Sequence, residues 1–302
     1  MAYGGRMTNG AMHPLPSPED LEVVVPAPGA GPGNWAGAAA VVLVDGVFWL
    51  TFRVRRPLAA GRGVSVVVAR SSDGVQFSDV AKVGREAFDV ESFERPVLVP
   101  LPEGGWRLYL SCATPGSKHW WVDSLTAASP ADLPDGERRV VLLGDSVTAV
   151  KDPVILVREG KWQMWLCCHP LDDPGQEDRM STRHLVSSDG LEWHNTGEVL
   201  TGSAGTWDAR GARVTAVLGT SPLVVLYDGR ADAAANWCET TGVARWDGTR
   251  LVADPAVEPI ASPHSDGAFR YGCAVPLPDG RTRFYLESAR PDGAHDLVTC
   301  VR

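Results

Sequence analysis

The 302-residue sequence predicts an all-β fold in which one unit of about 58 residues occurs five times. Each unit begins with a run of alternating apolar residues, and a Gly-containing turn then leads into a second run rich in aromatic residues. The chain also contains 32 Gly and 23 Pro, which is more helix-breaking residues than long helices tolerate. Four strand-like runs in each unit are typical of a blade, so the sequence predicts a five-bladed β-propeller.

The first two runs of each unit predict a β-hairpin, because period-two apolar runs flank a tight turn. The five hairpins begin at Ala38, Arg95, Asp152, Ala212 and Gly272. Their turn glycines are Gly46, Gly104, Gly160, Gly219 and Gly280. A third strand-like run and a second Asp-Gly turn follow the hairpin, as seen at Val64–Ser71, His184–Ser187 and Gly242–Arg245.

The two ends of the chain together account for the last blade. After Gly272 the remaining residues suffice for three strands, of which Leu297–Val301 is the last. We expect the run Leu21–Val25 to supply the fourth strand, which closes the ring and removes an exposed sheet edge. Residues 1–20 are expected to form a flexible lead-in, and residues 21–302 a single propeller domain.

Charge and hydropathy argue against several classes of partner. A formal charge of −9 repels nucleic-acid phosphates and acidic membrane surfaces, so neither is an expected partner. The longest apolar runs are far shorter than the ~20 residues that a membrane span needs. The first residues lack the apolar core of a secretory signal, which favours a cytoplasmic location.

The six cysteines form no Cys-x-x-Cys pair, so we expect buried free thiols instead of disulfides or a metal knuckle. No cluster of His, Asp and Glu has metal-ligand spacing, and no Gly-rich loop has a convincing phosphate-binding pattern. The sequence therefore predicts neither a metal nor another cofactor. It also indicates no dimerisation surface, so it leaves the oligomeric state open.

The candidate site lies at the face where the first strand of each blade starts. The loop after the second strand returns to this face and is rich in polar, charged and aromatic residues, whereas the opposite face has short turns. Four carboxylates here are candidates for catalysis: Asp152, Glu94, Asp208 and Glu239. Simpler roles stay open, since Asp152 can bond to Lys151 or to backbone N–H groups. Likewise, Glu94 can pair with Arg95, and Asp208 can cap a turn.

The same face carries the residues that we expect to bind substrate: Trp35, Arg53, Arg95, Lys118, His119, Trp120, Lys151, His169, Asp172, Arg210, Arg213, Asp228, Arg230, Arg270 and Tyr271. Tryptophan rings, Trp121 and Trp237 included, can stack on the C–H surface of a sugar, and packing between blades explains them equally well. The two histidines suit substrate hydrogen bonds or proton transfer, or are simply bonded within the fold. The basic residues can hold a carboxylate ionised or bind an anionic group.

Three segments resemble the five-bladed-propeller glycoside hydrolases. They are NWAGAAAVVLVDGVFWLTFR from Asn34, VKDPVILVREGKWQMWLCCHP from Val150, and GTWDARGARVTAVL from Gly205. The sequence resembles family 130, which contains β-mannoside phosphorylases and hydrolases, and more distantly families 43 and 32. This resemblance covers most of residues 30–290 and implies a site in the central funnel that acts on a carbohydrate.

The sequence departs from these families at their usual catalytic acids. Family 130 carries Glu-Asp-Pro-Arg in the second blade with the Asp as proton donor, whereas this chain has Glu94-Arg95-Pro96-Val97. The first-blade Asp of family 43 is missing from the segment Asn34–Gly37, and its Glu is missing at Ala212-Arg213. Only Asp152 matches, and the resemblance implies that it binds substrate or modulates the pKa of another group.

The leading hypothesis is a carbohydrate-active enzyme, a glycoside hydrolase acting on a small glycan or glycoconjugate in the central funnel. Such an enzyme needs one protonated and one ionised carboxyl group on either side of the scissile bond. A phosphate-dependent phosphorylase is the first alternative, with the Arg, Lys and His residues binding phosphate. A non-catalytic propeller that binds a sugar or a natural product is the second, because the usual acids are missing.

Overall fold

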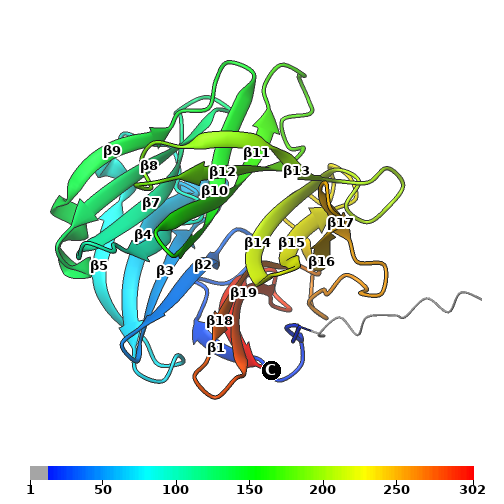
Figure 1. Cartoon of the computed structure of the whole chain (residues 1–302). Helices are drawn as coiled ribbons and strands as arrows, with labels where there is room; N and C mark the ends of the chain where they lie inside the picture. The colour runs from blue at the N-terminus through cyan, green and yellow to red at the C-terminus, as the bar shows by residue number, and fades with distance from the viewer. Residues whose placement is uncertain (1–12) are drawn as a thin grey trace, which may run out of the picture.

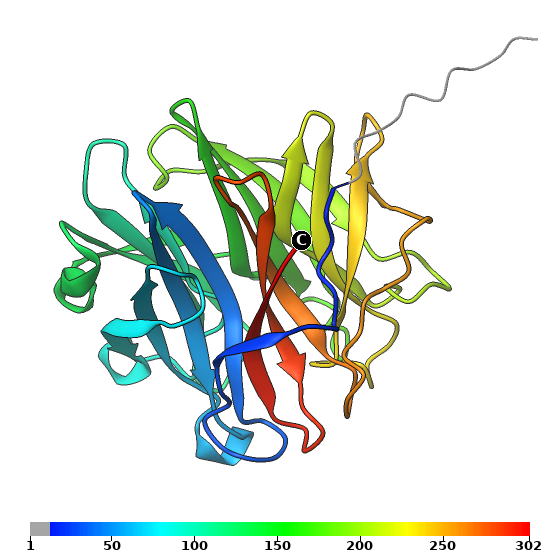
Figure 2. The ribbon, with the colours of Figure 1, turned by 90° about the horizontal axis from the view of Figure 1, so that it is seen from below.

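The computed structural model describes residues 13–302 and consists mainly of antiparallel β-strands arranged around a centre (Figures 1 and 2). Three sheets contain four strands each, hydrogen-bonded in chain order. The first comprises β6 (Val97–Pro100), β7 (Trp106–Ala113), β8 (Trp120–Ala127) and β9 (Glu137–Leu142). The second comprises β10 (Thr148–Arg158), β11 (Lys161–Pro170), β12 (Ser181–Ser187) and β13 (His194–Thr201). The third comprises β14 (Gly211–Thr220), β15 (Leu223–Arg230), β16 (Thr240–Trp246) and β17 (Leu251–Ala253).

The remaining eight strands form one sheet that joins the two ends of the chain. Its N-terminal part is β2 (Trp35–Val44), β3 (Val47–Arg55), β4 (Gly63–Ser71) and β5 (Ser78–Gly84). Its C-terminal part is β18 (Phe269–Pro276), β19 (Thr282–Ala289) and β20 (His295–Val301), together with β1 (Glu22–Val25). A single parallel pair, Trp35 with His295, connects β2 to β20. The prediction of an all-β fold is therefore confirmed.

The predicted pairing of the two chain ends is also confirmed. Strand β1 runs antiparallel to β20, with Glu22 opposite Thr299 and Val25 opposite Leu297. The blue N-terminal segment accordingly lies beside the red C-terminal strands (Figure 2). Of the expected lead-in, residues 1–12 lie outside the described residues.

Four of the five predicted hairpin turns fall where their glycines indicated. At Asp45-Gly46 and Glu159-Gly160 both turn residues have positive φ, which matches the twist of the flanking strands. The fourth hairpin also forms, but the predicted position of its turn is wrong. Gly219 lies within β14 opposite Val224, and the chain reverses two residues later at Ser221-Pro222. Ser221 and Pro222 are the two turn residues between the paired Thr220 and Leu223, and Pro222 has no backbone N–H to donate to the ladder.

In the described part of the chain, helical structure is confined to three 3₁₀ turns at Leu58–Ala60, Arg85–Ala87 and Pro130–Asp135. Within residues 13–302, no helix has the length and apolar character that crossing a membrane requires. All six cysteines are free thiols, as expected, and all except the half-buried Cys238 are buried.

Apolar clusters fill the spaces between neighbouring groups of strands. One cluster joins Val66 and Val68 of β4 to Leu108 and Leu110 of β7. Similar clusters lie between the first and second four-stranded sheets, between the second and third, and between the third sheet and β18–β20. The last cluster packs β2 and β3 against β19 and β20. Apolar packing is therefore continuous around the ring and includes the seam between the chain ends.

Hydrogen bonds at the outer turns tie neighbouring groups of strands together. In the two Ser-Ser-Asp-Gly turns, the hydroxyls of Ser71 and Ser187 accept the backbone N–H of the glycine. The glycine carbonyls then accept a tyrosine hydroxyl from the preceding group of strands, Tyr285 to Gly74 at 2.8 Å and Tyr109 to Gly190 at 2.7 Å. This repeated sequence motif therefore supports the packing between sheets.

The packing of β1 against the C-terminal strands can be tested by substituting two of its valines. Val25 packs on the cluster between β2–β3 and β19–β20, whereas Val23 of the same strand is 50% exposed. We expect Val25→Asp to lower the free energy of unfolding by about 2 kcal/mol, because it loses buried apolar area and inserts a charge. Val23→Asp, the matched control, should change it by less than about 0.5 kcal/mol. Urea unfolding measures the free energy of unfolding of each variant. Equal losses in Val25→Asp and Val23→Asp would contradict the packing of β1.

Candidate active site

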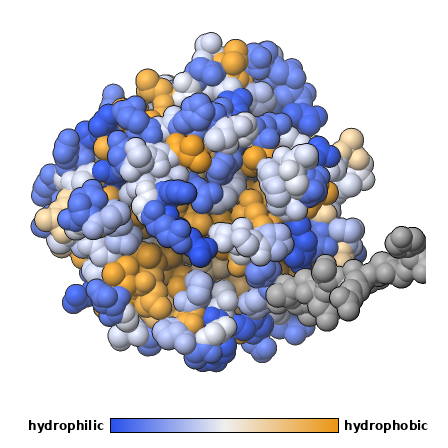
Figure 3. All heavy atoms as spheres, in the orientation of Figure 1, coloured by the Kyte–Doolittle hydropathy of each residue, from blue (hydrophilic) through white to orange (hydrophobic). Residues whose placement is uncertain are grey.

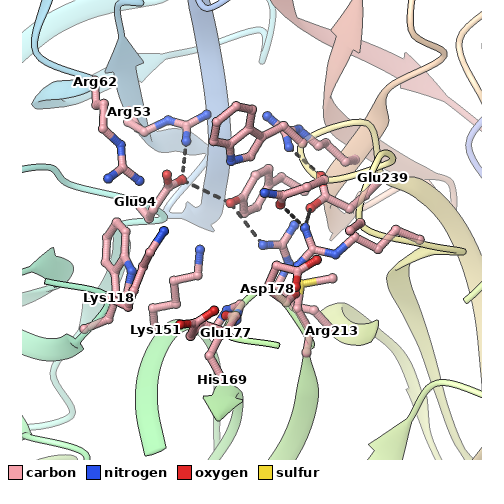
Figure 4. A pocket seen from close by; sticks show the side chains of 18 of the residues that line it. Arg53, Arg62, Glu94, Lys118, Lys151, His169, Glu177, Asp178, Arg213 and Glu239 are labelled. Carbon is pink, nitrogen blue, oxygen red and sulfur yellow. Dashed lines mark hydrogen bonds and ion pairs between the residues drawn. The ribbon is translucent and has the colours of Figure 1, made fainter. Parts of the chain in front are cut away.

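The starts of the innermost strands and the loops beside them surround a cavity of about 430 Å³ (Figure 4). Sequence analysis predicted this face, and the structure brings most of the predicted side chains to it. Those that line the cavity are Trp35, Arg53, Glu94, Lys118, Trp120, Lys151, His169, Arg213, Arg230, Glu239, Arg270 and Tyr271. Their placement is thereby established, while their roles stay predictions.

Sequence analysis missed several residues of the cavity wall. They are Leu58, Arg62, Ser117, Glu177, Asp178, Met180, Ala233 and Asn236. All eight belong to segments that connect the second and third strands of a group. The return loops were a usable signal, but irregular backbone carries no periodicity that shows which loop residue faces inward.

Bulges in three innermost strands turn side chains toward the centre of the ring. Ala38, Asp152 and Tyr271 have positive φ of 52°, 51° and 54°, and the pairing register shifts at each position. An extra residue in a strand re-aims a side chain, and positive φ is uncommon outside Gly, so such bulges are specific features. Asp152 of β10 and Tyr271 of β18 consequently meet, with 3.4 Å between Oδ2 and the phenol oxygen.

A buried guanidinium sits at the bottom of the cavity. Arg213 of β14 donates to Asp152 at 2.8 Å and to Asp228 at 2.6 Å, and its Cζ lies 3.9 Å from the centre of the Tyr271 ring. The Tyr271 hydroxyl lies 3.0 Å from Nη1 of Arg213 and 3.1 Å from Oε2 of Glu94. Asp152 is fully buried, so it holds Arg213 and Tyr271 in place without lining the cavity.

Glu94 is the first of two buried carboxylates that line the cavity. It forms an ion pair with Arg53 of β3 and accepts the hydroxyl of Tyr271. Burial favours the protonated form of Glu94, but the positive charges of Arg53 and then Lys151 outweigh it and lower the pKa to about 2. Glu94 is therefore ionised at neutral pH, and the alternative that it pairs with Arg95 is wrong.

Glu239, the second such carboxylate, precedes β16. It pairs with Arg270 at 2.5 Å and with Arg230 at 3.1 Å. Burial again favours protonation, but Arg270 and then Arg230 hold the pKa of Glu239 below its usual range. Glu239 is therefore ionised as well.

Glu287 of β19 links these two pairs, although it was not predicted as a site residue. It accepts from Arg53 at 2.8 Å and from Arg270 at 2.6 Å, and His295 contacts it at 2.9 Å. A chain of alternating charges thus runs from Glu94 through Arg53, Glu287 and Arg270 to Glu239. Gly37 allows this approach, since a Cβ there would lie 2.2 Å from Oε2 of Glu287.

His169 enters the cavity wall as a neutral imidazole. Burial, and then the charges of Lys151 and Arg230, hold its pKa well below the usual value. Nδ1 lies 3.0 Å from the carbonyl oxygen of Glu177, which can only accept, so Nδ1 carries the proton. Nε2 is then an acceptor, 3.5 Å from the Cys167 sulfur.

The cavity is cationic although the protein is acidic. Seven Arg and Lys residues line it, against four Asp and Glu residues. Lys118 forms no ion pair with any residue in 13–302, and Lys151 lies 3.6 Å from Asp152 and 4.8 Å from the centre of the Trp120 ring. Arg62, 5.6 Å from the same ring, pairs with the half-exposed Glu91. These three cations offer donors to an anionic or hydroxyl-rich ligand.

Three of the predicted residues lie beneath the cavity. Asp152 and Asp228 are buried against Arg213, as described above. Asp152 also accepts the backbone N–H of Arg95 at 3.1 Å. The Arg95 side chain lies on the far side of this layer, away from the cavity.

Four other predicted residues lie to the side. Asp208 is buried against Tyr227, whose hydroxyl it accepts at 2.9 Å, and accepts the N–H of Ser203 in its own turn, which supports the capping alternative. Asp172 and Arg210 line a separate cleft, where Arg210 pairs with Asp178. His119 bonds to Thr114 and to the Leu143 carbonyl oxygen.

Among residues 13–302, no group of three His, Cys, Asp or Glu side chains is placed to hold a metal ion. The donors of the cavity are mostly cationic and suit anions and hydroxyl groups instead.

Comparisons with protein-family models and with curated proteins find no match. Solved structures do match over most of the chain. A β-1,2-mannobiose phosphorylase from Listeria innocua, in complex with β-1,2-mannobiose, is 16% identical with a TM-score of 0.64, over 94% of this chain and 91% of that one. A thermostable family-43 glycoside hydrolase is 14% identical with a TM-score of 0.67, over 93% and 91%.

A third structure comes from family 130 of mannoside phosphorylases, which contains glycoside hydrolases that target β-1,2-mannosidic linkages in Candida mannan. It is 15% identical with a TM-score of 0.61, over 97% of this chain and 95% of that one. At these identities the likeness shows the fold. The chain has the propeller fold of the glycoside hydrolases and phosphorylases that its sequence resembles.

The ion pair of Glu94 predicts how stability depends on pH. Unfolded Glu94 takes up a proton near its ordinary pKa of about 4.3, whereas the folded carboxylate does so only near about 2. Between these values the unfolded state binds more protons, so the stability that Glu94 contributes is lost as the pH falls. Glu94→Gln should therefore lower the free energy of unfolding at pH 6. The gap in this free energy between the variant and the wild type should be smaller at pH 3.

Urea unfolding at the two pH values measures this difference. Glu103→Gln, which changes an exposed glutamate in a turn, is the control and should show no comparable narrowing. If the free energies of unfolding of Glu94→Gln and the wild type differed by the same amount at both pH values, Glu94 would not be held ionised by Arg53.

Proposed function

We propose that this protein is a carbohydrate-active enzyme, a glycoside hydrolase that acts on a small glycan or glycoconjugate bound in the cavity. The observation that carries the proposal is the pair Glu94 and Glu239, two buried carboxylates that line the cavity and are held in fixed positions by Arg53, Glu287 and Arg270. Two positioned carboxyl groups are what glycoside hydrolysis requires. The propeller fold of the similar structures supports the same class of substrate.

In the proposed mechanism Glu239 is the ionised group. Its two arginines keep it deprotonated, so it can take a proton from water or attack the anomeric carbon itself. Glu94 is the acid. Burial is the largest influence on its pKa and favours protonation, so Glu94 gains a proton once a sugar hydroxyl engages Arg53 and weakens that ion pair. The proton then passes to the leaving glycosidic oxygen.

Other residues position the substrate. Trp120 and the exposed ring of Trp237 offer faces to sugar C–H groups, and Lys118 and Lys151 offer donors to its hydroxyls. Asp152 is a positioning residue, because it fixes Arg213 and Tyr271 without reaching the cavity.

We also propose that the fold is a five-bladed propeller and a single domain over residues 21–302. The eight-stranded sheet then counts as two blades, because only the pair Trp35 and His295 joins its halves. The apolar clusters that continue around the ring support one domain. The six free thiols support a cytoplasmic location, where thiols stay reduced.

Activity on chromogenic glycosides tests the proposal. Glu94→Gln and Glu239→Gln should each lower kcat/KM by about 10²–10⁴-fold, the usual contribution of a positioned acid or base. Glu137→Gln, on the exposed strand β9, should leave it unchanged. Near-normal turnover in either cavity variant would overturn the assignment. Sugars that raise the Tm without any turnover would instead support the non-catalytic binder.

A phosphorylase is the second candidate, and the cations Arg62, Lys118 and Lys151 favour it, because they could bind phosphate beside Glu94. In that case turnover should require phosphate, and Lys118→Met should raise the KM for phosphate by about tenfold, the value of one lost charged hydrogen bond. The full chain assayed with and without phosphate decides between the two, since a hydrolase turns over equally in both.

A further inference from the structure

The opposite mouth of the central channel contains a second cavity, of about 490 Å³. Its walls come from the later parts of all five innermost strands, β2, β6, β10, β14 and β18, beyond the residues that line the first cavity. These walls are almost entirely Val, Leu, Ile, Ala and Pro. Hydrophobic residues gather around a hollow near the middle of the face shown in Figure 3, in the region of β2, β14 and β18 in Figure 1.

One guanidinium interrupts this apolar lining. Arg95 is 2% exposed, and within the described residues its one side-chain hydrogen bond goes from Nη2 to the Gly272 carbonyl oxygen at 3.2 Å. Its Nε and Nη1 atoms are buried and have no partner among residues 13–302, and no carboxylate there forms an ion pair with it. A buried charge with unused donors is costly unless a ligand satisfies it.

A second unsatisfied group lies on the same wall. The hydroxyl of Thr215 on β14 is buried without a hydrogen-bond partner in the described residues, and Thr215 lines this cavity together with Arg95. Cys273 of β18 is the remaining polar side chain of the lining, and its sulfur bonds to the backbone of Val41. The unused donors therefore come from Arg95 and Thr215.

From these contacts we propose that the second cavity binds an amphiphilic monocarboxylate, with its carboxylate on Arg95 and Thr215 and its apolar body against the strands. One unpaired guanidinium matches one negative charge. A doubly charged anion such as phosphate would leave a charge uncompensated among apolar walls. A small inorganic anion would leave the apolar walls uncovered. A hydrocarbon chain that fills the cavity would bury them, and burial of apolar surface favours binding.

Calorimetric titration of the full chain with straight-chain carboxylates tests the site. Octanoate should bind and raise the Tm, and each methylene removed on the way to butanoate should weaken binding by about fourfold. Octan-1-ol, with the same chain and no charge, should bind at least tenfold more weakly. Equal affinity for the acid and the alcohol, or no binding of octanoate, would overturn the proposal.

Variants locate the site within the channel. Arg95→Met should weaken octanoate at least tenfold and leave octan-1-ol unchanged, because it removes the charge and keeps the apolar stem. Thr215→Val, nearly equal in shape, should weaken octanoate several-fold and serves if Arg95→Met does not fold. Lys151→Met, which alters the first cavity, should leave octanoate unaffected. Octanoate binding lost in Lys151→Met but kept in Arg95→Met would place the ligand in the first cavity and refute the inference.

Discussion

The chain of alternating charges from Glu94 to Glu239 is the constraint on which the rest of the cavity depends. Each of its five groups is buried, and a charge removed from water costs several kcal/mol unless partners compensate it. Arg53 and Arg270 each serve two carboxylates, and Glu287 serves both arginines. No member can therefore move alone. Glu94 and Glu239 are consequently fixed relative to each other through Glu287, which does not line the cavity.

This chain also explains why the seam of the ring lies next to the cavity. His295, which pairs with Trp35 to join β20 to β2, contacts Glu287 through Nδ1 and stacks on the Trp35 ring at 4.5 Å. The Trp35 ring in turn lies 4.7 Å from the Arg270 guanidinium. Closure of the ring and completion of the charged chain consequently require the same residues, so the fold positions the site at the point where its two ends meet.

The sequence predicted what depends on local pattern. Period-two runs and Gly turns predicted the hairpins, and the count of strands after Gly272 predicted the pairing of β1, whereas the turn expected at Gly219 lies at Ser221-Pro222. The partner of Glu94 could not be predicted. Arg95 is adjacent in sequence, but Arg53 is the partner because the ring brings β3 beside the start of β6. Glu287 likewise pairs with Arg53, which is 234 residues away in the chain, although its other partners Arg270 and His295 lie on the adjacent strands.

The bulges explain why the two ends of the innermost strands line two different cavities. Up to the bulge at Asp152, β10 supplies charged side chains to the centre of the ring, and beyond it the strand supplies Val154 to Val157. Bulges at the same depth in β2, β14 and β18 make the same change in their strands. Asp152 accepts both the backbone N–H of Arg95 and the guanidinium of Arg213, so it joins the layers on either side. A shift of one residue in each strand thus separates a cationic mouth from an apolar one.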